Sequence, residues 1–213
     1  MPEVIRINDR ISYIKASEEP LSSDVVIIDG DEYTYLFDVG NNEEVAAYLE
    51  ALPKKKKVIL SHFHQDHMGN IGELDCDLVY VGKGTEKYLE ETIPRQVLCE
   101  SVSIQDGVEL EIYPMPNSHA KGSLVLMVDR EYLFLGDSLY SKVQDDKYVY
   151  NAQLLKEEIE LLKHLSAETV FSCHEVRPLE RKDGVIRFLE QIYAKREKGD
   201  PYIRVSRSGN GEN

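Results

Sequence analysis

One short segment constrains the fold more than any other part of the chain. Residues 61–69, Ser-His-Phe-His-Gln-Asp-His-Met-Gly, place three histidines and an aspartate within six residues. They follow the apolar run Val58–Leu60 directly, and such a run predicts a short buried strand. Imidazole nitrogens and carboxylate oxygens are ligands that Zn²⁺ prefers. We therefore interpret this segment as a metal-binding loop at the end of a strand, with its ligands drawn from His62, His64, Asp66 and His67.

A metal ion needs more ligands than one loop supplies, so the fold must bring other side chains to this loop. Four candidates lie where a predicted strand meets a loop, the usual place for a site on a sheet scaffold: Asp38, His119, Asp137 and His174. The sixth histidine, His164, lies inside a predicted helix, and we expect it to be no ligand.

The periodicity of apolar residues predicts strands in the front of each half of the chain and helices behind them. The expected strands are 11–15, 25–29, 33–39, 58–60, 78–81, 108–113, 124–129, 132–135 and 169–172, and the expected helices follow Asn42, cover 85–91 and 152–165, and follow Gly184. This pattern fits an α+β fold in which two sheets pack face to face with helices outside. We expect one domain over residues 1–205 and a disordered polar tail over 206–213.

The order of these candidates resembles the five-motif signature of the metallo-β-lactamase superfamily. Asp38 comes first, the HxHxDH segment His62–His67 second, and His119, Asp137 and His174 follow. The resemblance covers residues 38–174 and implies a four-layer αβ/βα sandwich. It also implies that His62, His64 and His119 hold one metal, that Asp66, His67 and His174 hold the other, and that Asp137 bridges the two. Asp38 would orient ligands by hydrogen bonding.

The resemblance further implies a hydrolase with two divalent metal ions, most often Zn²⁺, with iron or manganese as alternatives. Two such ions activate water for attack on a carbonyl or phosphoryl centre. We expect Asp66, Asp38 and Tyr140 to take part in catalysis.

Three ester-like substrates of small molecules remain open. Thioester hydrolysis would be similar to glyoxalase-II-like proteins, although only 39 residues follow His174 here. Lactone hydrolysis would be similar to lactonases in which a tyrosine three residues after the bridging aspartate, here Tyr140, contacts the substrate. Hydrolysis of a small phosphodiester would use the charges of Lys121 and Arg177. The expected substrate-binding residues are thus Tyr140, Lys121 and Arg177.

Two alternatives of the same fold stay open. One is a mononuclear-iron persulfide dioxygenase, and the other is a metal-bound sensor or binding module without catalysis. An oxygen-reducing diiron role is disfavoured, because such relatives carry a glutamate where this chain has His64.

Composition excludes several partners. The net charge of −14 repels phosphate backbones, so we expect a small-molecule substrate and no large nucleic acid. No apolar run approaches the ~18 residues of a membrane span, and the first residues show no secretory signal. The three cysteines, an odd number without CxxC spacing, fit a reducing cytoplasm, and Cys173 is expected to pack rather than bind metal. Nothing in the sequence indicates the oligomeric state.

Overall fold

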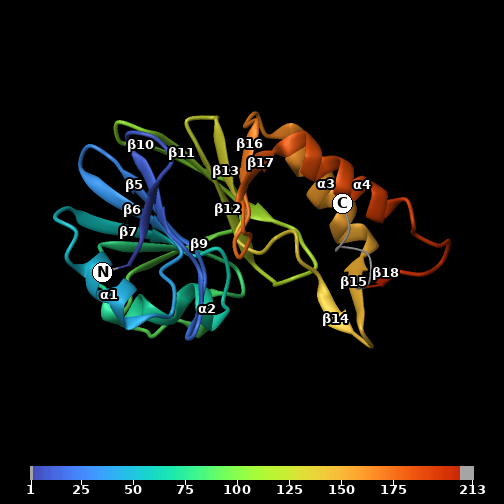
Figure 1. Cartoon of the computed structure of the whole chain (residues 1–213), viewed down its shortest axis with the longest axis horizontal. Helices are drawn as coiled ribbons and strands as arrows, with labels where there is room; N and C mark the ends of the chain where they lie inside the picture. Colours follow the sequence, from blue (N-terminus) through green and yellow to red (C-terminus); the bar gives the residue numbers. More distant parts are fainter. Residues whose placement is uncertain (1, 207–213) are drawn as a thin grey trace.

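The computed structural model describes residues 2–206 and contains two large sheets, two small ones and helices on either side (Figure 1). The helical elements are α1 (Glu43–Glu50), α2 (Gln65–Met68), α3 (Ala152–His164), α4 (Lys182–Tyr193) and the 3₁₀ turns η1 (Gly69–Glu73) and η2 (Glu86–Tyr88). In this part of the chain, every helix is too short or too polar to cross a bilayer.

The first large sheet comes from the first half of the chain. Its strands, in spatial order, are β1 (Val4–Arg6), β2 (Ile11–Ile14), β5 (Val25–Asp29), β6 (Tyr33–Phe37), β7 (Lys55–Ile59), β8 (Leu78–Gly82) and β9 (Arg95–Leu98). Strands β1 to β6 pair antiparallel, and β6 to β9 pair parallel. A two-stranded ribbon, β3 (Ser17–Glu18) and β4 (Leu21–Ser22), lies between β2 and β5 in the chain.

The second large sheet comes from the second half. Its order is β10 (Val102–Gln105), β11 (Glu109–Met115), β12 (Ser123–Val128), β13 (Tyr132–Phe134), β16 (Thr169–Phe171) and β17 (Leu179–Arg181). Only the β13–β16 pair is parallel in this sheet. A separate three-stranded sheet, β14 (Lys142–Gln144), β15 (Lys147–Asn151) and β18 (Tyr202–Ser206), stands beside α3 (Figure 1).

Both large sheets are buried on both faces, and the alternation of side chains along each strand explains why. Val26 and Ile28 of β5 point into the core between the two sheets, whereas Val25 and Ile27 pack toward α1 and α2. On β12, the even-numbered residues 124, 126 and 128 share the central core, and residues 125 and 127 pack against α3 and α4. The layers are therefore helix, sheet, sheet and helix, which confirms the expected four-layer αβ/βα sandwich.

The parallel pairs explain where the candidate ligands gather. Strands β6 and β7 run parallel, so Asp38 after β6 and His62 after β7 emerge at one edge of the first sheet. Strands β13 and β16 run parallel as well, so Asp137 and His174 emerge at one edge of the second sheet. The sheets meet at this edge, where the Leu124 amide donates a 2.8 Å hydrogen bond to the Ser61 carbonyl.

The expected elements differ from the observed ones in a few places. Residues 85–91 are expected to form a helix, but only the 3₁₀ turn η2 is present. Leu89 after this turn has an extended backbone and a buried side chain, and β9 begins a few residues later, directly after Pro94. Ser206, expected in the disordered tail, is the last residue of β18 and pairs with Lys147. Buried Ile203 and half-buried Val205 hold this strand on α3 and α4. Residues 207–213 lie outside the described part of the chain.

Candidate metal centre

The histidine-rich loop begins where β7 ends and turns at once into α2. The side chain of His62 is buried, and its Nδ1 lies 2.9 Å from the Ser61 hydroxyl. His64 stands at the N-cap of α2, so Asp66 and His67 occupy the first turn of that helix. This change of direction lets His62 and His64 face one position while Asp66 and His67 face a neighbouring one.

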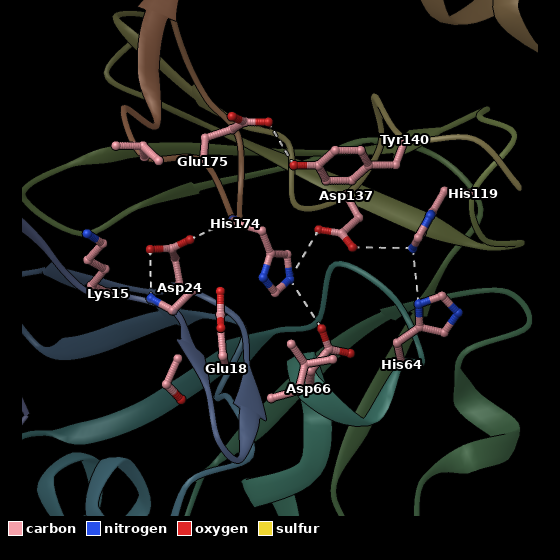
Figure 2. Close-up of a pocket in the computed structure, with 14 residues that line it drawn as sticks. Lys15, Glu18, Asp24, His64, Asp66, His119, Asp137, Tyr140, His174 and Glu175 are labelled. Carbon is pink, nitrogen blue, oxygen red and sulfur yellow. Dashed lines mark hydrogen bonds and ion pairs between the residues drawn. The ribbon is translucent and has the colours of Figure 1, made fainter. Parts of the chain in front are cut away.

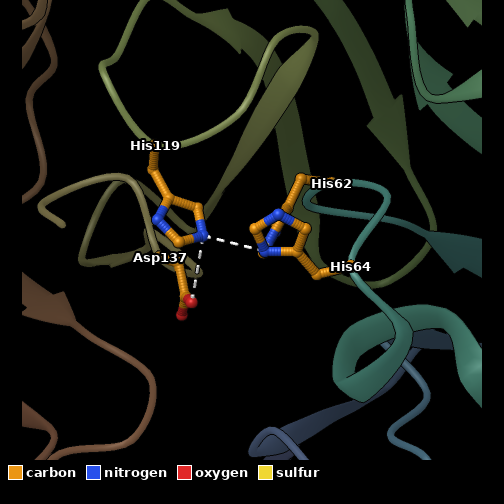
Figure 3. Close-up of side chains that lie close together, drawn as sticks. All are labelled: His62, His64, His119 and Asp137. Atoms are coloured by element: carbon orange, nitrogen blue, oxygen red, sulfur yellow. Dashed lines mark hydrogen bonds and ion pairs between the residues drawn. The ribbon is translucent and has the colours of Figure 1, made fainter. Parts of the chain in front are cut away.

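The first group of candidate ligands is His62, His64, His119 and Asp137, whose ligand atoms all lie within 4.8 Å of one another (Figure 3). His64 Nδ1 is 2.9 Å from His62 Nε2 and 3.0 Å from His119 Nε2. His119 Nε2 is also 3.4 Å from Asp137 Oδ2. Three imidazole nitrogens and one carboxylate oxygen thus converge on one point.

The second group is Asp66, His67, Asp137 and His174, again within 4.8 Å. His174 Nε2 lies 3.2 Å from Asp66 Oδ2 and 3.4 Å from His67 Nε2. His67 Nε2 lies 3.3 Å from Asp137 Oδ1. Figure 2 shows Asp137 between His174 on one side and His119 on the other.

Asp137 is the residue that the two groups share, and its environment tests whether they suit metal ions. Its side chain is buried, and Oδ1 makes no hydrogen bond within residues 2–206, although His67 Nε2 lies 3.3 Å and His174 Nε2 3.7 Å from it. A buried carboxylate oxygen needs a cation or a donor beside it, and a metal ion held by these imidazoles can take that role. The donor set of five imidazoles and two carboxylates matches the chemistry of borderline divalent ions. The residues present therefore fit a pair of metal sites.

Asp38 contacts the histidine-rich loop through both of its carboxylate oxygens. Its Oδ1 accepts a 2.7 Å hydrogen bond from the Ser61 amide, and its Oδ2 lies 2.7 Å from His67 Nδ1. A proton on Nδ1 leaves the lone pair of His67 Nε2 facing the second group. Asp38 itself has a left-handed backbone with φ +61°, which aspartate tolerates better than most residues.

The two groups differ electrostatically. Burial lowers the pKa of His62 far below its usual range and that of His119 to about 4, so these two imidazoles are neutral beside the Asp137 carboxylate. For His67, burial acts in the same direction, but the carboxylates of Asp38 and Asp137 outweigh it and raise the pKa to about 10. A hydrogen bond to Asp66 raises the pKa of His174 as well. The second group therefore holds the protons that a metal ion would displace.

Asp24 supports His174 in a way that the sequence pattern did not indicate. One carboxylate oxygen accepts a 2.9 Å hydrogen bond from the His174 amide, and the other accepts a 3.0 Å bond from the Ala16 amide (Figure 2). His174 has φ +63°, an uncommon conformation for a residue with a side chain, and the bond to Asp24 holds it there. Asp24 directly precedes β5 as the third residue of Ser-Ser-Asp, a pattern that also fits an ordinary turn.

A cavity of about 680 Å³ opens over the two groups and is lined by His64, His119, Asp137 and His174 among others. Tyr140 lies in its wall, as Figure 2 shows, but its hydroxyl is 2.9 Å from both the Cys173 carbonyl and a Glu175 carboxylate oxygen. Its single proton is therefore engaged away from the ligands, and its role toward substrate stays a prediction.

Four other residues named from the sequence fall in different places. Lys121 lines a second cavity that also touches His64 and His119. Arg177 is exposed and lines neither cavity. Cys173 is fully buried in the core between the sheets, although its sulfur lies within 4.8 Å of ligand atoms of Asp38 and His67, and burial raises the pKa of its thiol well above the usual value. His164 is exposed at the end of α3 and belongs to neither ligand group.

A comparison with known protein families finds a match, and it includes the histidine-rich loop. The family model described as the metallo-β-lactamase superfamily matches residues 19–76, which include Asp38 and the whole histidine loop. Over this segment the chain is similar to the metallo-β-lactamase superfamily. This match confirms the resemblance inferred from the order of the motifs.

Curated relatives include a hydroxyacylglutathione hydrolase of Shewanella baltica, 28% identical over 149 residues. The match covers 66% of this chain and 56% of that relative, so the chain spans about half the length of the curated relatives it matches.

Several solved structures share the fold at low sequence identity. An archaeal superfamily protein of Sulfolobus tokodaii is 20% identical, with a TM-score of 0.62 over 90% of this chain and 89% of that one. The flavodiiron protein of Giardia intestinalis is 12% identical, with a TM-score of 0.69 over 92% of this chain and 60% of that one. Likenesses at this level establish the architecture alone.

Proposed function

We propose that this protein is a dinuclear-metal hydrolase that cleaves an ester-like bond in a small molecule. The observation that carries the proposal is the position of Asp137, which belongs to both ligand groups at the base of the 680 Å³ cavity. One metal ion would be held by His62, His64 and His119 and the other by Asp66, His67 and His174, with Asp137 common to both. When bound, two divalent ions supply activated water and stabilise charge that develops on the substrate oxygen.

The protein residues around this centre orient its ligands. Asp38 holds the tautomer of His67, and Asp24 holds the backbone of His174. Tyr140 and Glu175 are hydrogen-bonded to each other and line the cavity beside Asp137.

A thioester is the substrate that we favour, because the curated relatives are named as hydroxyacylglutathione hydrolases. In such a reaction the oxygen of water bonds to the acyl carbon, the carbon–sulfur bond breaks, and the thiol leaves with a proton. Lactones and small phosphodiesters are the alternatives that the cavity also suits. We further propose zinc as the native metal and the cytoplasm as the compartment, because all three cysteines are free.

The test begins with purification and metal analysis. We expect two equivalents of zinc and hydrolysis of at least one thioester, with lactones and phosphodiesters assayed in parallel. The matched control is His164→Ala, which removes a histidine outside both groups and should leave metal content and turnover unchanged. One equivalent of iron with oxygen consumption would replace the proposal by a persulfide dioxygenase. Two tightly bound metals without turnover of any of the three substrate classes would replace it by a binding module.

A further inference from the structure

A second cavity, of about 1040 Å³, adjoins the metal centre on the side away from Asp24. It shares His64 and His119 with the first cavity, so a substrate over the metal ligands can extend into it. We call this second cavity the lateral groove. Its walls come from η2, from the loop 116–122 that carries His119, and from the three-stranded sheet β14–β15–β18.

The lateral groove is cationic in a strongly acidic protein. The chain has 39 acidic and 25 basic residues, yet the described residues that line the groove include no aspartate or glutamate. They include four cations: Lys87, Lys121, Lys142 and Arg204. A random sample of this surface would contain more carboxylates than cations, so the composition of the groove points to a ligand of negative charge.

The cavity over the metal ligands has the opposite character. Besides the candidate ligands Asp66 and Asp137, it is lined by Glu18, Asp24 and Glu175, with Lys15 as its one cation among the described residues. The two cavities meet at His64 and His119. Bound metal ions would offset the charge of Asp66 and Asp137, but Glu18, Asp24 and Glu175 are not candidate ligands and keep that side of the centre acidic. An anionic part of a substrate that spans both cavities is therefore better placed in the groove.

Two of the groove cations are free to bind. Lys121 and Lys142 are exposed and form no ion pair or hydrogen bond through their side chains within residues 2–206. Arg204 lies 2.6 Å from Asp200 through one nitrogen, and Lys87 lies 4.9 Å from the centre of the Tyr88 ring. These two ammonium groups, one on the loop 116–122 and one on β14, can bind carboxylate or phosphate oxygens without first breaking a contact.

A stacked aromatic pair lines the groove next to the candidate ligand His64. The rings of Phe63 and Tyr88 stack with centroids 4.5 Å apart and planes inclined by 12°, and the Phe63 ring lies 4.9 Å from that of His64. Both residues line the groove. This pair offers apolar surface for the part of a substrate that joins its scissile bond to its charged end.

From these contacts we infer that the lateral groove binds a carboxylate- or phosphate-bearing arm of the substrate, with Lys121 and Lys142 as the main contacts. The inference rests on the proposed function, since it places this arm beside the bond that the metal centre would cleave. It makes the preferred substrate an ester or thioester with an anionic extension on one side of the scissile bond.

Binding tests the groove without any turnover. The probe is pyrene-1,3,6,8-tetrasulfonate, an aromatic polyanion, titrated into the metal-loaded protein at low salt and followed by fluorescence polarisation. Three proteins are compared: wild type, Lys121→Gln with Lys142→Gln, and the control Lys195→Gln with Lys198→Gln, which removes the same charge from an exposed segment after α4. We expect the groove variant to bind about tenfold more weakly and the control to match wild type. Equal affinity in all three proteins would overturn the inference.

Kinetics then identifies the kind of arm. One acyl group is presented as a thioester of neutral N-acetylcysteamine, of glutathione, which carries carboxylates, and of coenzyme A, which carries phosphates. We expect kcat/KM for at least one anionic thioester to fall about tenfold in the groove variant through KM, and that for the neutral thioester to stay unchanged. The anionic thioester that is affected shows whether carboxylate or phosphate is bound. An equal fall for all three thioesters would refute a charge-specific groove.

The two proposals fail in distinguishable ways. If no thioester is hydrolysed but the probe distinguishes the groove variant from its control, the anionic groove stands and the proposed reaction falls. If thioesters are hydrolysed and neither probe nor kinetics separates the variants, the reaction stands and the groove falls.

Discussion

Replacing Asp38 by asparagine should weaken one metal site selectively, and the structure indicates how. Asn keeps the size of the side chain and tolerates the left-handed backbone at φ +61°. In the wild type, the two carboxylate oxygens of Asp38 accept from the Ser61 amide and from His67 Nδ1, each at 2.7 Å. Asparagine has only one side-chain oxygen and can accept from only one of these two donors. If the amide oxygen stays on Ser61, its NH₂ group faces Nδ1 and forces the proton of His67 onto Nε2. If the amide flips, the NH₂ group opposes the Ser61 N–H instead.

The magnitude follows from the bond that is lost. A hydrogen bond to a charged group contributes about 1.5–3 kcal/mol, which corresponds to roughly 10–150-fold in an equilibrium constant. A proton on Nε2 points toward Asp66, Asp137 and His174 and occupies the lone pair that a metal ion would use. We therefore expect the affinity for one equivalent of metal to fall at least tenfold, in line with about 10–100-fold for other residues that orient metal-bound histidines.

The assay is a competition titration of the zinc-loaded protein with a chromophoric chelator, together with metal content by mass spectrometry. The control is Asp106→Asn, which makes the same change in a carboxylate that accepts from the Glu32 and Tyr33 amides at the far end of β6. We expect the control to keep two tight equivalents and Asp38→Asn to keep one. Two equivalents with wild-type affinity in Asp38→Asn would refute the tautomer argument.

Three further predictions follow from other residues. Asp137→Ala should lose most of at least one metal equivalent and most activity, and two retained equivalents by mass spectrometry would exclude a shared ligand. Tyr140→Phe should keep its metals but lose roughly a hundredfold in kcat if the hydroxyl leaves Glu175 to donate to the substrate; a wild-type rate would reduce Tyr140 to packing. Glu158 is buried with no partner for Oε1 among the described residues, and burial raises its pKa well above the usual value. Glu158 therefore keeps its proton to higher pH in the folded protein than in the unfolded chain. As pH rises from the unfolded pKa of Glu158 toward its folded pKa, the free energy of unfolding falls by up to about 1.4 kcal/mol per pH unit. Glu158→Gln should match wild type near pH 4 and be more stable at pH 8 in urea unfolding, and parallel pH profiles would contradict this.

The sequence could predict the ligand groups because each candidate lies at a strand end. Apolar runs before Asp38, His62, Asp137 and His174 predict the strands, and the parallel pairs bring their carboxyl ends to one edge. Asp24 could not be found in this way, because its role depends on a contact with a residue 150 positions away. No local pattern records such a contact.

The lateral groove could not be predicted from the sequence either. Lys121 was a candidate because it follows His119, but Lys142 and Arg204 lie on a small sheet that sequence patterns did not predict. Strand β14 is exposed along its length and so lacks the alternation that indicates a strand. Its pairing with β15, and that of β15 with β18, creates the wall in which these cations meet.

The candidate ligands are divided between the two halves of the chain. A bound metal pair would therefore link the two halves to each other. Four of the seven candidates, His62, His64, Asp66 and His67, come from the first sheet, and His119, Asp137 and His174 come from the second. Neither sheet completes a site alone, so metal affinity is gained only when the two sheets are docked. At a free metal concentration a thousand times the dissociation constant, one such site adds about 4.1 kcal/mol to the stability of the docked state. Chelation would thus loosen the contact between the sheets first, at the edge where the Leu124 amide meets the Ser61 carbonyl.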